Sequence, residues 1–299
     1  MRRAAVVVAS ALVASVCSMT ACSLFTSLSG FSDGDGTTDA AGDTGSNPTD
    51  GSSGNDGQTA DGGGDAADAG PSRSALYAQA VLADGPLGYW RLEEASGDVA
   101  KDETGRHDGE CFDGPLRGQP GIVGSRGMKF PTGNTARLVV ASDAYAFGGN
   151  AAHTIEMWAK PGALRDYQWL ATTEKPVAGG RNGWSLLGDS DGKIRYEFWR
   201  SDGDGGFAVP RGVLSEAVMT GAFNHVVIVY DGTTVRGFLG GVEFGGFNNS
   251  VVIPNDGELT WGCDRNNQGC LDEWVIDELA IYAGALSVDR VLAHYTLGK

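Results

Sequence analysis

The feature that most constrains the fold is a series of short segments, rich in β-branched and aromatic residues, that recurs between residues 88 and 282. Gly, Asp and Asn residues separate these segments, and Asp-Gly pairs tolerate the positive φ angles that tight hairpin turns need. Segments of this length and composition are typical of β-strands. We therefore predict strands over residues 88–93, 128–131, 136–141, 153–160, 168–174, 184–188, 193–200, 206–210, 224–231, 235–240, 258–262 and 274–282.

Helical signals are few by comparison. Residues 75–84 could form one turn or more ahead of the strands. Near the C-terminus, apolar residues recur at helical spacing from Val288 to Tyr295, and Ser287 is a suitable N-cap. No repeat with a period of about 20 to 50 residues occurs, which argues against a propeller or a solenoid. The sequence predicts an all-β domain, a two-sheet antiparallel jelly-roll sandwich, with short helical segments at its start and near the C-terminus.

The N-terminus predicts export. Arg2 and Arg3 precede an apolar run whose length is typical of a secretory signal and too short for a transmembrane helix. The residues from Met19 to Cys22 resemble a bacterial lipoprotein lipobox, with Met19 in place of the more usual Leu. The resemblance implies a signal peptide over residues 1–21, lipidation of Cys22, and anchoring to the bacterial envelope, at the outer membrane, with the domain either in the periplasm or exposed at the surface. An ordinary signal peptide with an incidental cysteine is the alternative.

Residues 22–72 read as a tether. From residue 32 onward they contain no aromatic residue, no Lys and no Arg, so this segment cannot bury enough apolar area to offset its ordering entropy. We expect a disordered linker, which leaves residues 73–299 as the folded domain. The linker holds nine Asp and the signal two Arg, so the domain keeps a net charge of −9 of the −16 of the whole chain. This acidity argues against nucleic acid and against membrane contact other than through the lipid anchor.

Several blocks of the domain carry a family resemblance. Residues 82–110, 118–133, 153–161, 223–241 and 276–295 resemble, in the same order, the laminin-G-like, concanavalin A-like jelly-roll domains of bacterial exported proteins. The resemblance implies two curved antiparallel sheets, often with a structural calcium ion, in proteins that bind glycans, cell-surface proteins or other surface molecules. Because the functions of the family are diverse, the fold alone does not supply one.

The same family borders on glycoside hydrolases of the laminarinase type, whose two catalytic carboxylates lie on one strand in a Glu-x-Asp-x-x-Glu pattern. The most similar stretch here, from Glu273 to Glu278, has a different spacing. Strand alternation is expected to place Asp277 and Glu278 on opposite faces, too far apart to flank one glycosidic bond. Motifs of metalloproteases, serine hydrolases and phosphate-binding loops are absent from the sequence. We therefore predict a protein that is not an enzyme, with a divergent glycoside hydrolase as the alternative.

The strand over residues 274–282 raises a question of its own, because Asp277 and Glu278 interrupt an apolar run. In the family this block often lies near the first-strand block, and a structural calcium ion can bridge the two. The resemblance implies Asp277 as a ligand, with Glu93 and Asp102 as further candidates. The alternative is that Asp277 or Glu278 accepts hydrogen bonds from backbone N–H groups, from His225 or from an arginine.

The seven tryptophans suggest a saccharide site, because sugar rings stack on aromatic faces. Alternation places Glu156 with Trp158 and Glu197 with Trp199 on common strand faces, and a tryptophan beside a carboxylate is a reasonable subsite. Most tryptophans of a sandwich instead belong to its core. The candidate ligand-binding residues are Trp169, Trp184, Trp199, Arg195 and Arg200, with the loop 201–206 as a possible rim or a simple turn.

Three cysteines fall in the domain: Cys111, Cys263 and Cys270. Export makes disulfides chemically feasible. Cys263 and Cys270 bracket a short polar loop, so their pairing is the most economical and leaves Cys111 as the odd thiol. Pairing of Cys111 with either of the others stays open.

These inferences predict a non-enzymatic, lipid-anchored envelope protein whose laminin-G-like domain binds a glycan or another surface molecule. A protein-binding or structural module without a sugar site is the main alternative.

Overall fold

The computed structural model describes residues 70–124, 126–133, 135–201, 207–208, 211–213, 221–249, 251–254 and 256–299, with the backbone alone for residues 207–208 and 211–213. The predicted signal peptide, Cys22 and the linker as far as residue 69 lie outside these residues, as does the loop 202–206. Within the described ranges, no helix is both long enough and apolar enough to cross a membrane.

One antiparallel sheet, sheet A, has the strand order β16-β15-β14-β7-β18-β5-β4, with β1 also paired to β18. Long apolar segments form its centre, where β7 and β18 pair. Its strands are β1 (Gly88–Trp90), β4 (Leu116–Pro120), β5 (Arg126–Phe130), β7 (His153–Lys160), β14 (Asn224–Tyr230), β15 (Thr234–Leu239), β16 (Val242–Asn248) and β18 (Trp274–Tyr282).

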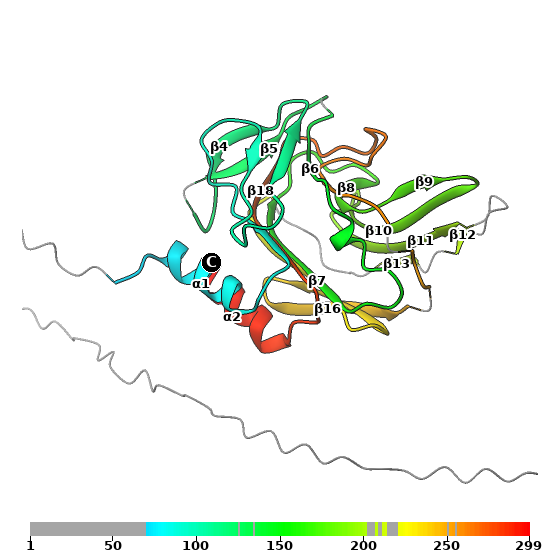
Figure 1. The fold of residues 1–299 in the computed structure, drawn as a ribbon. Helices are drawn as coiled ribbons and strands as arrows, with labels where there is room; N and C mark the ends of the chain where they lie inside the picture. The colour runs from blue at the N-terminus through cyan, green and yellow to red at the C-terminus, as the bar shows by residue number, and fades with distance from the viewer. Residues whose placement is uncertain are drawn as a thin grey trace, which may run out of the picture. The chain divides into compact units, whose positions relative to one another are not determined.

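The other antiparallel sheet, sheet B, has the order β12-β11-β10-β8-β17-β6-β3-β2, with β9 paired to β10 and β13 paired to β11. Its strands are β2 (Val99–Ala100), β3 (Gly109–Phe112), β6 (Arg137–Val140), β8 (Gln168–Thr172), β9 (Lys175–Val177), β10 (Gly180–Gly188), β11 (Ile194–Ser201), β12 (Phe207–Ala208), β13 (Arg211–Val213) and β17 (Leu259–Trp261). The two sheets confirm the predicted all-β, two-sheet antiparallel sandwich (Figure 1).

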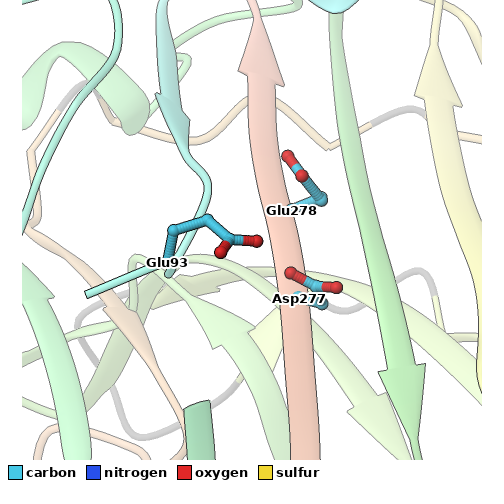
Figure 2. Close-up of side chains that lie close together, drawn as sticks. All are labelled: Glu93, Asp277 and Glu278. Atoms are coloured by element: carbon cyan, nitrogen blue, oxygen red, sulfur yellow. The ribbon is translucent and has the colours of Figure 1, made fainter. Parts of the chain in front are cut away.

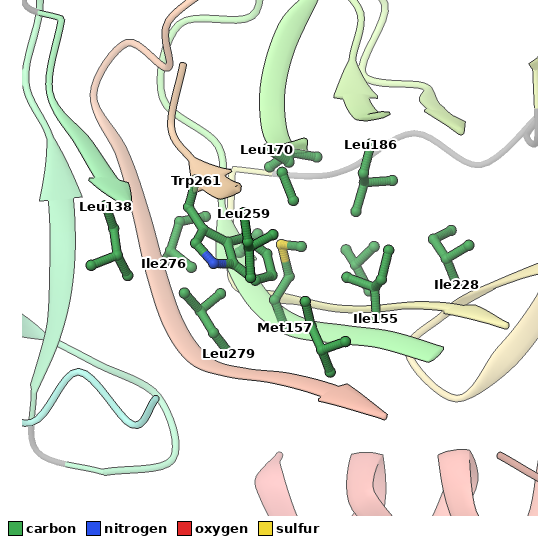
Figure 3. Packing of buried hydrophobic residues seen from close by; sticks show 14 of the residues in the cluster. Leu138, Ile155, Met157, Leu170, Leu186, Ile228, Leu259, Trp261, Ile276 and Leu279 are labelled. Carbon is green, nitrogen blue, oxygen red and sulfur yellow. The ribbon is translucent and has the colours of Figure 1, made fainter. Parts of the chain in front are cut away.

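The hydrophobic core lies between the two sheets. Figure 3 shows Ile155 and Met157 of β7 in one cluster with Leu170 of β8 and Leu186 of β10. Four tryptophans are buried in the same cluster: Trp90, Trp184, Trp261 and Trp274. The apolar faces of the two sheets therefore pack against each other. This leaves the outer faces of the sheets and the ends of the strands as the surfaces where a ligand could bind.

Two α-helices cover the outer face of sheet A. They are α1 (Arg73–Ala83) and α2 (Val288–Gly298), and a short 3-10 helix, η1 (Asp143–Tyr145), lies elsewhere in the chain. Ser287 is the N-cap of α2, as predicted, and accepts a hydrogen bond from the Arg290 N–H at 3.3 Å. The buried side chains of the helices pack onto outward-facing residues of sheet A in two clusters, one of Tyr77, Val81, Tyr89, Val123, Trp158, Ala280 and Tyr282, the other of Val291, Val227, Val229 and Phe238.

A buried carboxylate, Glu156 of β7, joins the helices to sheet A. Its oxygens accept hydrogen bonds from the hydroxyls of Tyr77 at 3.0 Å and Tyr282 at 2.9 Å, from His225 Nε2 at 2.8 Å, and from His294 Nδ1 at 3.0 Å. Burial acts to raise the pKa of Glu156, but the charge of His294 and the hydrogen bond from His225 hold it well below its usual range. Glu156 is thus an ionised centre on which both helices converge.

The ring of His294 lies between two carboxylates. Nδ1 faces Glu156, and Nε2 lies 3.0 Å from Asp84 Oδ2 at the end of α1. Although burial acts to lower it, the negative charge of Glu156 raises the pKa of His294. A carboxylate near each ring nitrogen favours the charged imidazolium form, with a hydrogen bond at Nδ1 and an ion pair at Nε2. The sugar subsite predicted at Glu156 and Trp158 is wrong, because α1 and α2 cover both residues.

The predicted disulfide is confirmed: Cys263 is bonded to Cys270, and Cys111 is a free, buried thiol. The disulfide closes the loop that connects β17 to β18.

Candidate functional site

The two acidic residues of β18 lie at a β-bulge. Asp277 pairs with Trp158 and Ala280 with Glu156, so that Glu278 and Leu279 together oppose Met157 of β7. Glu278 has a φ of 51°, which accommodates the extra residue. The prediction that Asp277 and Glu278 face opposite sides is wrong, because it assumed an uninterrupted ladder. Both side chains leave the core, while Ile276 and Leu279 point into it.

Glu93 completes an acidic cluster with these two residues (Figure 2). It follows β1 in the chain, and it offers an oxygen that lies within 4.8 Å of an oxygen of both Asp277 and Glu278. These three residues form the one such group of metal-ligating side chains among the described residues. The structure thus brings together the predicted ligands Asp277 and Glu93 and adds Glu278.

The two carboxylates of β18 differ in their partners: Asp277 has hydrogen bonds to one of its oxygens only, and Glu278 is paired with an arginine. Asp277 Oδ2 accepts hydrogen bonds from the backbone N–H groups of Ile122 at 2.8 Å and Val123 at 3.3 Å. Asp277 Oδ1 is buried without a hydrogen-bond partner within the described part of the chain. Glu278 accepts from the Tyr89 hydroxyl and pairs with Arg91, whose Nη2 lies 2.9 Å from Glu278 Oε1.

Burial and mutual repulsion make this cluster electrostatically costly. Burial, followed by the charge of Glu278, raises the pKa of Asp277 to about 8. Burial raises the pKa of Glu278 to about 7, although the Arg91 guanidinium opposes the shift. With all three acids ionised, the cluster and Arg91 together carry a charge of −2, which a divalent cation would balance. The unpartnered Asp277 oxygen and the all-oxygen donor set fit a hard cation such as calcium.

Asp102 does not join the cluster. Its carboxylate accepts hydrogen bonds from the backbone N–H groups of Tyr89 at 3.0 Å, Thr104 at 2.9 Å and His107 at 2.9 Å. Burial acts to raise the pKa of Asp102, but these hydrogen bonds outweigh it and hold the pKa below its ordinary value. Asp102 therefore shapes the turn after β2 and has little capacity left for a metal.

The outer face of sheet B carries aromatic rings capped by guanidinium groups. Arg137 lies over Phe112 at 5.0 Å from the ring centroid, Arg181 over Trp199 at 5.0 Å, and Arg195 over Tyr167 at 4.8 Å. In β11 this face follows from alternation, because Ile194, Tyr196 and Phe198 point into the core and leave Arg195, Glu197 and Trp199 to point outward.

The candidate ligand-binding residues separate into three groups. Trp184 is wrong as a ligand residue, because it is fully buried between the sheets and its Nε1 donates to the Tyr145 carbonyl at 2.8 Å. Trp169 and Trp199 lie on the outer face but are only 8% exposed. Arg195 pairs with Asp189 at 2.5 Å. Arg200 is exposed and donates to the Val252 carbonyl at 3.4 Å.

The residues around three adjoining cavities on this side of the molecule were not predicted from the sequence. Three cavities, of about 480, 230 and 80 Å³, share Arg265 as a lining residue, and the two larger ones also share Glu258. Arg265 Nη2 pairs with Glu258 at 2.6 Å. The one sequence feature that could have pointed to Arg265 was its position in the loop closed by the Cys263–Cys270 disulfide.

Comparison with known proteins gives a family and a fold. A family model described as the concanavalin A-like lectin/glucanases superfamily matches residues 132–292. No match was found among curated proteins.

Solved structures share the architecture at low identity. Domain 4 of AbnA, a GH43 extracellular arabinanase from Geobacillus stearothermophilus in complex with arabinotriose, aligns with a TM-score of 0.55 and 18% identity over 72% of this chain and 98% of that chain. The Trypanosoma rangeli sialidase in complex with the inhibitor DANA aligns with a TM-score of 0.54 and 14% identity, over 72% of this chain and 34% of the sialidase chain. The botulinum neurotoxin serotype D binding domain aligns with a TM-score of 0.53 and 15% identity, over 73% of this chain and 52% of the neurotoxin chain. This chain thus spans about half of that neurotoxin chain and about a third of the sialidase chain.

Proposed function

The chain belongs to the concanavalin A-like lectin/glucanases superfamily, and from that membership we propose that it is a non-enzymatic glycan-binding protein, held at the bacterial envelope by a lipid on Cys22. The ligand lies on the outer face of sheet B. The observation that carries this proposal is the row of guanidinium groups stacked on aromatic rings and paired with carboxylates on that face, which offers flat surfaces beside hydrogen-bond donors and acceptors.

The choice of face rests on what covers the other one. The outer face of sheet A packs against α1 and α2, and Glu156, a fully buried acid beneath them, has its oxygens engaged by residues of both helices. Among the described elements, no α-helix packs onto the outer face of sheet B (Figure 1). We therefore place a ligand of several sugar rings on the outer face of sheet B, where cavities of about 480 and 230 Å³ open.

The structural neighbours support saccharide recognition. The arabinanase domain was solved with arabinotriose and the sialidase with the inhibitor DANA. Both are similar to this chain in fold alone, so they support the ligand class and leave the individual sugar to experiment.

A divergent glycoside hydrolase has one observation in its favour. Glu174 and Asp264 line one cavity, and burial raises the pKa of Glu174, as a general acid requires. That cavity has a volume of only about 80 Å³, whereas small-molecule sites span roughly 300–1,000 Å³. Glu174 is also occupied by Ser185 at 2.6 Å and Arg181 at 2.6 Å. A structural role for both acids is therefore favoured over catalysis.

Calcium is proposed as a structural cofactor at Glu93, Asp277 and Glu278. These residues join β18 to the segment after β1, while Asp277 Oδ2 accepts hydrogen bonds from residues 122 and 123. A divalent cation there would keep Asp277 ionised at neutral pH and hold three distant segments of the chain together. It has no part in the proposed saccharide contacts, because the cluster lies on sheet A.

Export and anchoring rest on the sequence of residues 1–22, and the acidic linker of residues 22–72 would hold the domain away from the membrane. Labelling with a palmitate analogue tests the anchor: Cys22→Ala should abolish incorporation, and label that persists in this variant would contradict lipidation at this residue.

A broad glycan array, probed with the full chain, tests the function. A confined set of glycan hits without release of reducing ends is the expected result. A blank array would favour the alternative of a protein-binding or structural module, and release of reducing ends at an enzyme-like rate would favour the hydrolase.

A further inference from the structure

The loop between β17 and β18 is built to hold its tip in one conformation. The Cys263–Cys270 disulfide closes its base. Within it, Asp264 Oδ1 accepts hydrogen bonds from the Asn266 N–H at 2.8 Å and the Gln268 N–H at 2.7 Å. Arg265 follows Asp264 directly, so its backbone is fixed by both the covalent and the hydrogen-bonded closure. A ligand that contacts this loop therefore restricts little further backbone freedom.

Arg265 forms an ion pair at a junction of cavities. Its Nη2 lies 2.6 Å from Glu258 Oε2, and both residues are partly exposed, with 28% and 44% of their side-chain surface accessible. The pair lines a cavity of about 480 Å³ on the side of Ser142, Asp143 and Lys175. It also lines a second cavity of about 230 Å³ on the side of Phe112 and Arg137. A chain-like ligand occupying both cavities must cross this ion pair.

The charges around these two cavities and the adjoining cavity of about 80 Å³ are paired, and the acids are in excess once the partner carboxylates Asp256 and Asp113 are counted. Each lining cation has a carboxylate partner within 3.0 Å: Arg265 with Glu258, Arg181 with Glu174, Lys175 with Asp256, and Arg137 with Asp113. Two further acids, Asp143 and Asp264, also line the cavities. An anionic ligand would have to displace a carboxylate from an arginine in a region that is already negative.

We infer that the Glu258–Arg265 ion pair is the centre of the saccharide site, and that the site takes a neutral oligosaccharide of two or more rings. This inference rests on the proposed glycan binding and deepens it. An arginine beside a carboxylate places donors and acceptors side by side, and a sugar hydroxyl uses both at once. Phe112 and Val139 supply an apolar floor in the smaller of the two cavities. Among the described residues that line the two cavities, no cation is unpaired, so a uronic or sialic acid would find no free positive charge there.

The test is a calorimetric titration of the full chain with soluble polysaccharides. The neutral probes are arabinan, xylan, mannan and a mixed-linkage β-glucan, and the acidic probe is polygalacturonate. The variants are Arg265→Ala and the nearly isosteric Glu258→Gln, with Arg236→Ala as the matched control. Arg236 is an arginine of β15, with its side chain 30% exposed, on the opposite sheet.

The expected result is binding of at least one neutral probe, a loss of tenfold or more in affinity in Arg265→Ala and in Glu258→Gln, and an unchanged affinity in Arg236→Ala. Melting temperatures of all variants separate a lost contact from a lost fold, and Glu258→Gln keeps the side-chain shape if Arg265→Ala unfolds.

Three results would overturn the inference, and they differ from one another. If no probe and no array glycan binds, the proposed function itself fails. If a neutral probe binds but both variants stay within twofold of the unmodified chain, the location is wrong. If polygalacturonate binds more tightly than every neutral probe, the ligand class is wrong.

Discussion

Asp277 and Glu278 are neighbours in β18 that point to the same outer face, because Glu278 is the extra residue of a β-bulge. A regular strand would have turned one of these acids into the hydrophobic core. The bulge instead gathers both next to Glu93, where three carboxylates share the charge of Arg91.

Calcium should stabilise the folded chain through Asp277. At a concentration about 100 times the Kd, a ligand that binds only the native state adds about 2.7 kcal/mol. We expect the melting temperature to rise on addition of calcium, to fall back in EDTA, and to be indifferent to both in Asp277→Asn. Glu243→Gln, an exposed acid of β16, is the control and should keep the response. Identical melting curves with calcium and EDTA would leave Asp277 as a buried hydrogen-bond acceptor.

The metal-free chain should become less stable as the pH rises from about 4 to about 8. The pKa of Asp277 is raised to about 8 in the folded state, against about 3.9 in an unfolded chain. Between these values the native state binds a proton that the unfolded state has lost, so the free energy of unfolding decreases with pH. Denaturant titrations in EDTA at several pH values measure this slope. Asp277→Asn should flatten it, and an equal slope in the variant would assign the effect to other groups.

The His294–Glu156 pair should hold the helices only while His294 is protonated. The pKa of His294 is raised in the folded state, so its contribution to stability is complete below the unfolded pKa and is lost as the pH rises through the folded one. Breaking a buried ion pair by removing one partner costs about 3–5 kcal/mol. We expect His294→Gln to lower the free energy of unfolding by this amount at pH 6, and by less at higher pH. His107→Gln is the control, since His107 contacts neither helix in any described hydrogen bond. A loss that does not vary with pH would contradict a charged His294.

Trp184 and Arg265 should respond in opposite ways to truncation. Replacing a buried tryptophan by alanine costs about 3–5 kcal/mol, so Trp184→Ala should reduce stability sharply; the milder Trp184→Phe should leave glycan preference unchanged. Arg265→Ala should leave the melting temperature nearly unchanged and weaken binding. Chemical denaturation and glycan binding on the same samples check both. A change of glycan preference in Trp184→Phe would contradict this prediction, because it would mean that a core residue affects the saccharide site.

Much of the fold could be predicted from the sequence because strand composition is local. Each of the twelve predicted segments contains or overlaps a strand of the structure, and residues 153–160 and 274–282 match β7 and β18 in both bounds. The strands that were missed have weak local signals. β16 contains two adjacent glycines, and β4 contains Gly118 and ends in Pro120, so each resembles a turn. Only pairing with β15 and β5 makes them strands.

The site was harder to predict because it depends on registers and faces. The bulge at Glu278 exists only as a mismatch with β7, which no single strand reveals. Alternation correctly grouped Glu156 with Trp158, yet it could not tell that α1 and α2 would cover that face. Trp184 and Trp199 lie on opposite faces of sheet B, and each has both apolar and polar residues within two positions in the sequence. The packing of the two sheets determines that Trp184, and not Trp199, points into the core.

Hydrogen–deuterium exchange of the full chain, with and without the tightest-binding glycan from the array, would locate the saccharide site. We expect slower exchange in the backbone amides of residues 258–268, around the Glu258–Arg265 pair, and no change in residues 121–124 beside Asp277. Protection at residues 121–124 or on α2, with none at residues 258–268, would contradict saccharide binding on the outer face of sheet B.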